Sequence, residues 1–142
     1  MKLCIGCDHA GYDLKNFIIK TLKNEHQIVD VGTNSSESVD YPDYSHRLAN
    51  CIISNEALVG IIICGSGNGV SMAVNKHNDI RAALCWTVEI SKLSRLHNDA
   101  NVLALPARFI TNEEAINIVN IFLETSFEGG RHYRRVNKIN CE

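Results

Sequence analysis

One segment of the sequence places a reactive side chain directly before a cluster of glycines. Cys64 ends the apolar run Val59–Cys64, and Gly65, Ser66, Gly67, Asn68 and Gly69 follow it. Glycines at alternating positions let the backbone turn tightly and point its N–H groups into one concavity. A helix beginning at this turn would add the positive end of its dipole. The hollow therefore suits a phosphate or a developing oxyanion, and a thiolate at its edge could serve as a base or nucleophile.

Two other interpretations of this segment were weighed. A cysteine in an apolar run is most often a small buried hydrophobic residue, and this is what we expect of Cys4, Cys51, Cys85 and Cys141. The dinucleotide-binding fingerprint requires GxGxxG after the first strand, whereas this turn is GxGxG after the third and lacks the Lys-Ser/Thr pair of a P-loop. The position of Cys64 against the glycine turn favours a functional role.

A set of basic residues could bind an anion. It comprises His9, Arg108, Arg131 and Arg135. Arg131 and Arg135 are four residues apart, so a helix would place them on one face, where two guanidinium groups can hold a phosphate dianion. The same spacing also fits a solvated basic face.

His97 lies in a polar segment, 95–101, that precedes an expected strand. An imidazole there could move protons near neutral pH, although the segment alone favours a histidine that caps a helix or satisfies the loop. No group of His, Cys and carboxylate residues shows the spacing of a metal site, so we expect neither metal nor cofactor.

The rest of the chain alternates short strand-like runs with helical patterns. Strands are expected at 2–7, 27–31, 59–64, 80–85 and 100–105, with helices between them and final helices at about 112–123 and 131–139. Thr111 and Glu114 form a predicted capping box at the start of the first of these. This alternation predicts a three-layer α/β/α, Rossmann-like fold with a five-stranded parallel sheet, as one domain over residues 1–142.

Ligands of such sheets bind beyond the carboxyl ends of the strands. Asp8 and His9 follow the first strand, Cys64 ends the third and Arg108 follows the fifth. We therefore expect these residues along one edge of the sheet.

Composition excludes several classes of protein. The 142 residues are 45% hydrophobic and 21% charged, with a formal net charge of -2. These values fit a globular protein without a global field that would attract nucleic acid or an anionic membrane. No apolar run approaches the ~20 residues of a membrane span, and the sequence begins directly as a strand. We expect a cytoplasmic protein with reduced thiols.

Several motifs, in order along essentially the whole chain, resemble the type B ribose-5-phosphate isomerases, in the family that also contains galactose-6-phosphate isomerase subunits. They are Gly6-Cys7-Asp8-His9-Ala10-Gly11, Asp40-Tyr41-Pro42-Asp43-Tyr44, Cys64-Gly65-Ser66-Gly67-Asn68-Gly69, Ser94-Arg95-Leu96-His97-Asn98-Asp99-Ala100-Asn101 and Glu128-Gly129-Gly130-Arg131-His132.

The resemblance implies an aldose–ketose isomerase of the non-oxidative pentose phosphate pathway. Cys64 would move a proton between C1 and C2 of the open-chain sugar, and the backbone of 65–69 would stabilise the enediolate. By the same resemblance, His97 would assist ring opening, alone or together with Asp8 or Ser66, Asn98 would bind substrate and Tyr41 would lie near the sugar. His9, Arg108, Arg131 and Arg135 match phosphate-binding positions. The family works without metal, as dimers or tetramers whose active sites are built from two subunits.

Other functions were kept open. The substrate could be a six-carbon sugar phosphate, such as allose or galactose 6-phosphate. In a different class, the chain could be a non-catalytic sugar-phosphate-binding module, or a redox sensor in which Cys64 pairs with Cys7.

Overall fold

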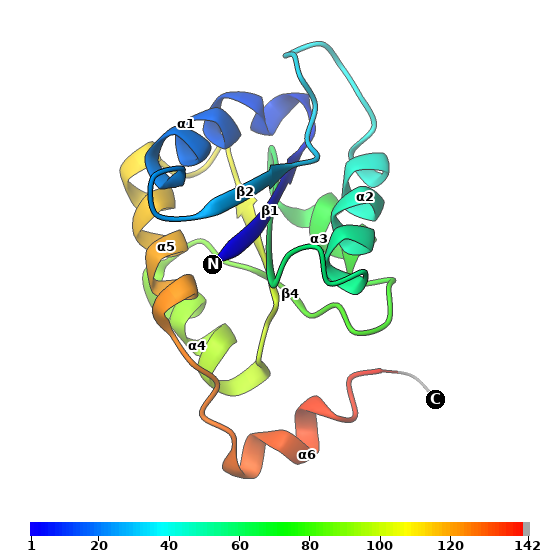
Figure 1. The fold of residues 1–142 in the computed structure, drawn as a ribbon, viewed down its shortest axis with the longest axis vertical. Coiled ribbons are helices and arrows are strands. Elements are labelled where there is room, and N and C mark those ends of the chain that lie inside the picture. Colours follow the sequence, from blue (N-terminus) through cyan, green and yellow to red (C-terminus); the bar gives the residue numbers. More distant parts are fainter. Residues whose placement is uncertain (141–142) are drawn as a thin grey trace.

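Five parallel strands form the centre of the computed structural model, which describes residues 1–140 (Figure 1). They are β1 (Lys2–Cys7), β2 (Gln27–Asp30), β3 (Val59–Cys64), β4 (Ala82–Leu84) and β5 (Val102–Pro106), in the order β2-β1-β3-β5-β4. After β1 the chain adds β2 on one side of it, and then crosses over to form β3 on the other side. The strand order therefore reverses between the neighbouring strands β1 and β3. Crevices at such switch points are where open parallel sheets bind ligands.

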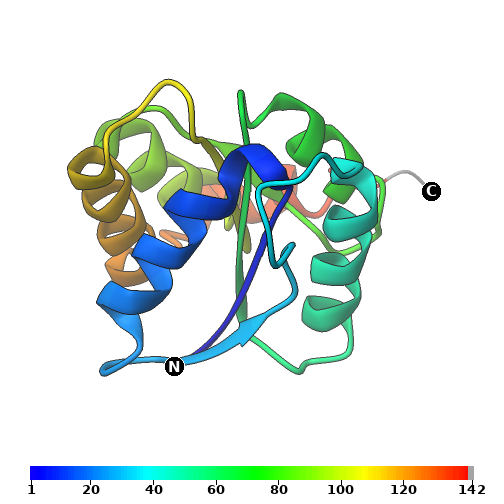
Figure 2. The same cartoon turned by 90° about the horizontal axis from the view of Figure 1, so that it is seen from above.

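Helices cover both faces of the sheet, as Figure 2 shows from above. On one face pack α1 (Tyr12–Leu22), α4 (Val88–Asn98) and α5 (Asn112–Glu124), and on the other α2 (Tyr41–Ile53) and α3 (Asn68–Val74). The remaining elements are η1 (His9–Gly11), η2 (Gly130–His132) and α6 (Tyr133–Val136). The predicted fold class is confirmed.

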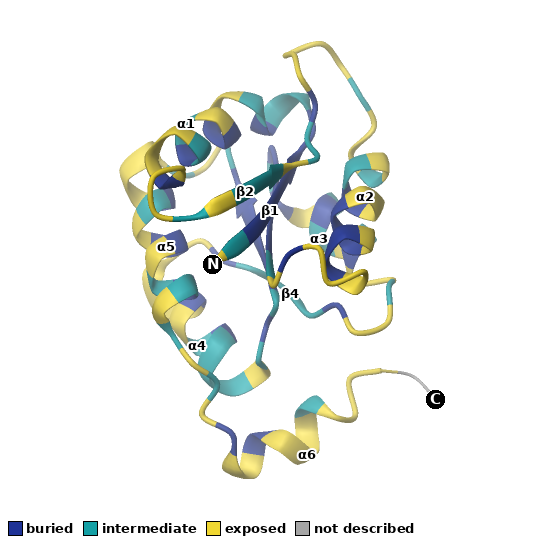
Figure 3. Ribbon diagram, viewed as in Figure 1, coloured by how far each residue is buried: buried dark blue, intermediate teal, exposed yellow. Residues whose placement is uncertain are grey.

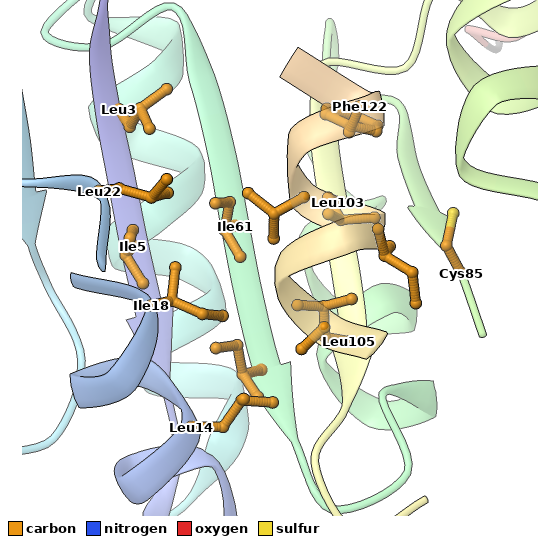
Figure 4. Packing of buried hydrophobic residues seen from close by; sticks show 14 of the residues in the cluster. Leu3, Ile5, Leu14, Ile18, Leu22, Ile61, Cys85, Leu103, Leu105 and Phe122 are labelled. Carbon is orange, nitrogen blue, oxygen red and sulfur yellow. The ribbon is translucent and has the colours of Figure 1, made fainter. Parts of the chain in front are cut away.

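The core consists of two clusters, one on each face of the sheet. Figure 4 shows the cluster on the α1 and α5 side, to which Ile18, Leu103 and Phe122 belong. The three central strands are buried along nearly their whole length (Figure 3). Strands buried on both faces read as continuous apolar runs, which is why Val59–Cys64 was identifiable from sequence.

Strand β5 begins two residues later than predicted, and two other predicted elements were wrong by more. Strand β4 is shorter than 80–85, and at its start two N–H groups bind asparagine side chains: that of Arg81 donates to Asn101 Oδ1 at 2.8 Å and that of Ala82 to Asn75 Oδ1 at 2.8 Å. The predicted helix 131–139 is a 3-10 turn followed by the four-residue α6, which has no buried residue. A helix without a packed face lacks the main source of helical stability.

Local polar contacts follow the predicted chemistry at the start of α5. The Glu114 N–H donates to Thr111 Oγ1 at 3.1 Å, and the Thr111 N–H donates to Glu114 Oε2 at 2.7 Å. The predicted capping box is confirmed. Within residues 1–140, every helix is too short or too polar to cross a bilayer.

Candidate active site

Cys64 lies at the carboxyl end of β3 with its sulfur against the following glycine turn. The backbone N–H of Gly67 donates to Cys64 Sγ at 3.1 Å, and Cys64 is only 5% exposed. Gly67 has a φ of 75° and directly precedes α3. A side chain there would also bring its Cβ within 3.1 Å of the Leu105 carbonyl carbon, so both the conformation and the space require glycine.

A pocket of about 420 Å³ opens beside this sulfur. It is lined by Asp8, His9, Ala10, Tyr41, Cys64, Gly65, Ser66, Gly69, Arg108 and Phe109. These residues come from the carboxyl ends of β1, β3 and β5 and from the start of α2. The structure thus brings together the residues that sequence predicted along one edge, and adds Phe109, which no sequence pattern had indicated. Asn68 begins α3 beside the pocket and does not line it.

Asp8 and His9 are held by local hydrogen bonds. Asp8 is buried, and its Oδ1 accepts from the N–H groups of Ala10 at 2.9 Å and Gly11 at 3.2 Å. His9 Nδ1 lies 3.2 Å from the Val39 backbone nitrogen and 3.3 Å from the Val39 carbonyl oxygen, so Val39 offers a partner to either tautomer of the imidazole. These contacts fix the loop after β1 against the rim of the pocket.

Arg108 and Tyr41 form opposite walls around the glycine turn. The Arg108 N–H donates to the Gly65 carbonyl at 3.0 Å, and the guanidinium lies directly over Gly65. The Tyr41 ring packs on Gly69 so closely that a Cβ there would come within 2.7 Å of the ring. The pocket therefore combines a thiol, a glycine turn, a guanidinium and an imidazole.

The other predicted site residues lie at the opposite end of the sheet. His97 and Asn98 end α4, which returns to the amino ends of the strands, and Arg131 and Arg135 lie in η2 and α6. In Figure 1, β1 runs upward away from α6, which lies at the bottom beneath α4. Within one chain, these four residues do not meet Cys64.

His97 and His132 form a stacked pair in this second group. Their rings are 4.5 Å apart at an angle of 14°, and Glu128 Oε2 lies 3.8 Å from His97 Nε2 and 3.7 Å from His132 Nε2. Burial, together with the charges of His97 and Arg131, lowers the pKa of His132. Glu128 and His132 belong to a motif recognised in the sequence, but neither had been given a role.

The arginines of this group are exposed. Arg135 Nη1 donates to the Arg131 carbonyl at 3.2 Å, so the two residues occupy successive turns of one short segment. The exposed side chains of Arg131 and Arg135 can therefore meet an anion from outside the chain.

Asn98 lines a separate pocket of about 580 Å³ with Lys76 and Arg81.

Comparison with known proteins gives the family. The Ribose/Galactose Isomerase family model matches residues 3–139. The chain belongs to this family. The prediction that it is an isomerase of that family is confirmed.

Its relatives match over nearly their full lengths. The chain is 47% identical over 137 residues to a probable ribose-5-phosphate isomerase B of Mycoplasma pneumoniae, covering 95% of the chain and 90% of that protein. It is 44% identical over 139 residues to ribose-5-phosphate isomerase B of Escherichia coli strain K12, covering 97% and 93%.

Solved structures of the family superpose closely on this fold. A ribose 5-phosphate isomerase from Thermotoga maritima has a TM-score of 0.96 at 48% identity, covering 97% of this chain and 96% of that one. Ribose-5-phosphate isomerase B from Mycoplasma genitalium, solved with bound ribulose-5-phosphate, has a TM-score of 0.93 at 43% identity, covering 97% and 93%.

Proposed function

We propose that this chain interconverts ribose 5-phosphate and ribulose 5-phosphate through an enediolate, with Cys64 as the base. The observation that carries the proposal is the Gly67 N–H donated to Cys64 Sγ in a pocket that also holds Arg108. The names of the relatives, and the ribulose-5-phosphate bound by one of them, support the choice of substrate.

The proposed chemistry follows from the pocket. The Cys64 thiolate removes the proton from C2 of the open-chain aldose and returns it to C1, while the hydroxyl proton of O2 passes to O1, which yields the ketose. Negative charge develops on the neighbouring oxygen, and amide N–H donors of 65–69 stabilise it. Each preorganised donor of this kind contributes roughly 3–4 kcal/mol to lowering the barrier. Asp8, Ser66 and Tyr41 line the space around the reacting carbons.

The phosphate would be held by cationic groups away from the reacting carbons. His9 and Arg108 stand at the rim of the Cys64 pocket, and Arg131 and Arg135 are exposed on the second group. Binding energy from the phosphate positions the sugar for proton transfer.

We further propose that two copies of the chain complete each active site. His97, which would assist ring opening, and Asn98 lie at the far end of the sheet from Cys64 in the same chain. A second copy, in a homodimer or homotetramer, would bring its His97, Asn98, Arg131 and Arg135 to the Cys64 pocket. A symmetric pair makes two such sites at once. We place this single-domain enzyme in the cytoplasm, in the non-oxidative pentose phosphate pathway.

The proposal is tested by assaying the purified protein with ribose 5-phosphate in the presence of EDTA. Cys64→Ala should lower kcat by about 10³-fold, the range for loss of a general base. Cys51→Ala is the matched control, because Cys51 is buried in the same core cluster but lies outside the pocket. No turnover by the wild type, or full activity in Cys64→Ala, would overturn the proposal.

A six-carbon substrate remains the alternative within the family, and comparison of kcat/KM for ribose 5-phosphate, allose 6-phosphate and galactose 6-phosphate decides between them.

The geometry argues against the redox sensor. Cys7 packs in the core cluster on the α1 face, whereas Cys64 packs in the cluster on the α2 face. Burial raises the pKa of Cys7 to about 12, which makes it a poor partner for thiol exchange. A Cys7–Cys64 disulfide after mild peroxide treatment would reverse this conclusion.

A further inference from the structure

Three side chains of types that can bind metal ions converge at the junction of α4 and η2. The donor atoms of His97, Glu128 and His132 all lie within 4.8 Å of one another. Two imidazole nitrogens and one carboxylate form a ligand set that Zn²⁺ accepts, with a fourth position left for water or another ligand.

The three groups do not satisfy one another by hydrogen bonding. Glu128 Oε2 is 3.8 Å from His97 Nε2 and 3.7 Å from His132 Nε2, beyond hydrogen-bond length. The His132 side chain is 9% exposed, and its Nε2 is buried with no hydrogen-bond partner among residues 1–140. A buried nitrogen in this state calls for a bound water or ion.

The backbone around the cluster is held in place by hydrogen bonds from α4. The Glu128 N–H donates to the Leu96 carbonyl at 3.1 Å, and Arg95 Nε donates to the Thr125 carbonyl at 3.2 Å. The His132 N–H donates to the Gly129 carbonyl at 3.0 Å. Donor atoms of a tetrahedral Zn²⁺ site are about 3.3 Å apart, given bonds of 2.0–2.1 Å. Small side-chain rotations on this fixed backbone would reach that spacing.

We propose that His97, Glu128 and His132 bind one divalent transition-metal ion, such as Zn²⁺, and that the bound ion inhibits the enzyme. Coordination occupies the Nε2 lone pair of His97, so the imidazole can no longer exchange a proton there. The nearby Arg131 and Arg135 oppose a cation electrostatically, which makes the site reversible rather than a permanent structural centre. The inhibition, though not the binding, rests on the proposed role of His97 in the isomerase.

Metal binding is tested with Co²⁺, whose visible absorption reports a low-coordinate site, followed by displacement with Zn²⁺. We expect one ion per chain, with affinity reduced at least tenfold in His132→Asn and in Glu128→Gln. Two control variants should bind as the wild type does. His46→Asn disrupts the exposed His46–His77 pair, whose nitrogens lie 2.7 Å apart, and Cys64→Ser removes the pocket thiol. Wild-type affinity in His132→Asn, or no absorbing Co²⁺ complex, would overturn the proposal.

Inhibition is measured separately, as the rate with Zn²⁺ relative to each variant's own rate in EDTA. Zn²⁺ should inhibit the wild type reversibly and inhibit His132→Asn at least tenfold less strongly. Equal inhibition of both would refute the regulatory part. An inactive wild type that still binds Co²⁺ would count against the proposed isomerase function and leave the metal site supported.

Discussion

The backbone N–H of Gly67 donates to the sulfur of Cys64 at 3.1 Å, and only glycine fits at position 67 without strain. An amide aimed at sulfur stabilises a thiolate, and its direction depends on the left-handed conformation of Gly67, with a φ of 75°. The proposed base and the turn behind it are therefore one structural unit.

Gly67→Ala should weaken the hydrogen bond from the residue-67 amide to Cys64 Sγ. The new Cβ would meet Leu84 and the Leu105 backbone and would tilt the amide away from the sulfur. We expect kcat to fall at least tenfold, with a smaller change in KM, as measured by steady-state isomerase kinetics. Gly130→Ala is the control for backbone strain without a steric clash, because Gly130 has a φ of 55° but no atom within 4 Å of a new Cβ. It should lose roughly 1 kcal/mol of stability, without the clash that Gly67→Ala introduces. Unchanged kcat in Gly67→Ala would contradict the role of the amide.

Subunit mixing tests the shared active site. Cys64→Ala and His97→Asn should each be nearly inactive alone, since each removes one half of every site. Unfolding and refolding an equimolar mixture should restore about a quarter of wild-type activity, because half of the molecules are mixed dimers with one intact site. Mixing two samples of the same variant is the control. If activity stays at the level of the separate variants, each site is built from a single chain.

The capping box at α5 should be worth a measurable part of the stability. Thr111→Ala removes the hydroxyl that accepts from the Glu114 N–H, and we expect a loss of about 1 kcal/mol in urea unfolding. Thr21→Ala is the matched control, since Thr21 lies within α1 and its hydroxyl donates to the Phe17 carbonyl. That substitution should change stability by less than about 0.5 kcal/mol. Equal losses in both variants would mean that the cap adds nothing specific.

Stability should decline at alkaline pH because of the buried thiols. Burial raises the pKa of Cys7 to about 12 and that of Cys85 to about 11, from an ordinary value of 9.0. Above pH 9 the unfolded chain releases these protons while the folded chain retains them, so the free energy of unfolding falls as pH rises toward 11. Urea unfolding in reductant between pH 8 and 10.5 measures the slope.

Cys85→Ala should flatten that slope while lowering stability at pH 8 through the cavity it leaves. Cys64→Ala, in the other core cluster, controls for the general effect of removing a buried thiol. A slope that Cys85→Ala leaves unchanged would assign the alkaline loss to other groups.

Much of the site chemistry was readable before the structure, because it depends on local pattern. Asp8, Cys64 and Arg108 each follow or end an apolar strand, and parallel strands bring their carboxyl ends to one edge. Phe109 carried no such signal: it is a side chain exposed after a strand, and only the turn that places Arg108 over Gly65 brings it to the pocket. The predicted final helix, 131–139, is longer than α6, because no residue of α6 is buried to stabilise a longer helix.

Residue types at short spacing were enough to predict the alternation of elements, the glycine turn after Cys64 and the family. The division of the predicted site into two groups depends instead on the path of the chain in space. Because α4 runs back along the sheet, His97 ends at the opposite edge from Cys64. The same return brings His97 against Glu128 and His132, which lie about thirty residues later in the chain. Such meetings depend on how helices cross a sheet, and spacing along the chain does not encode them.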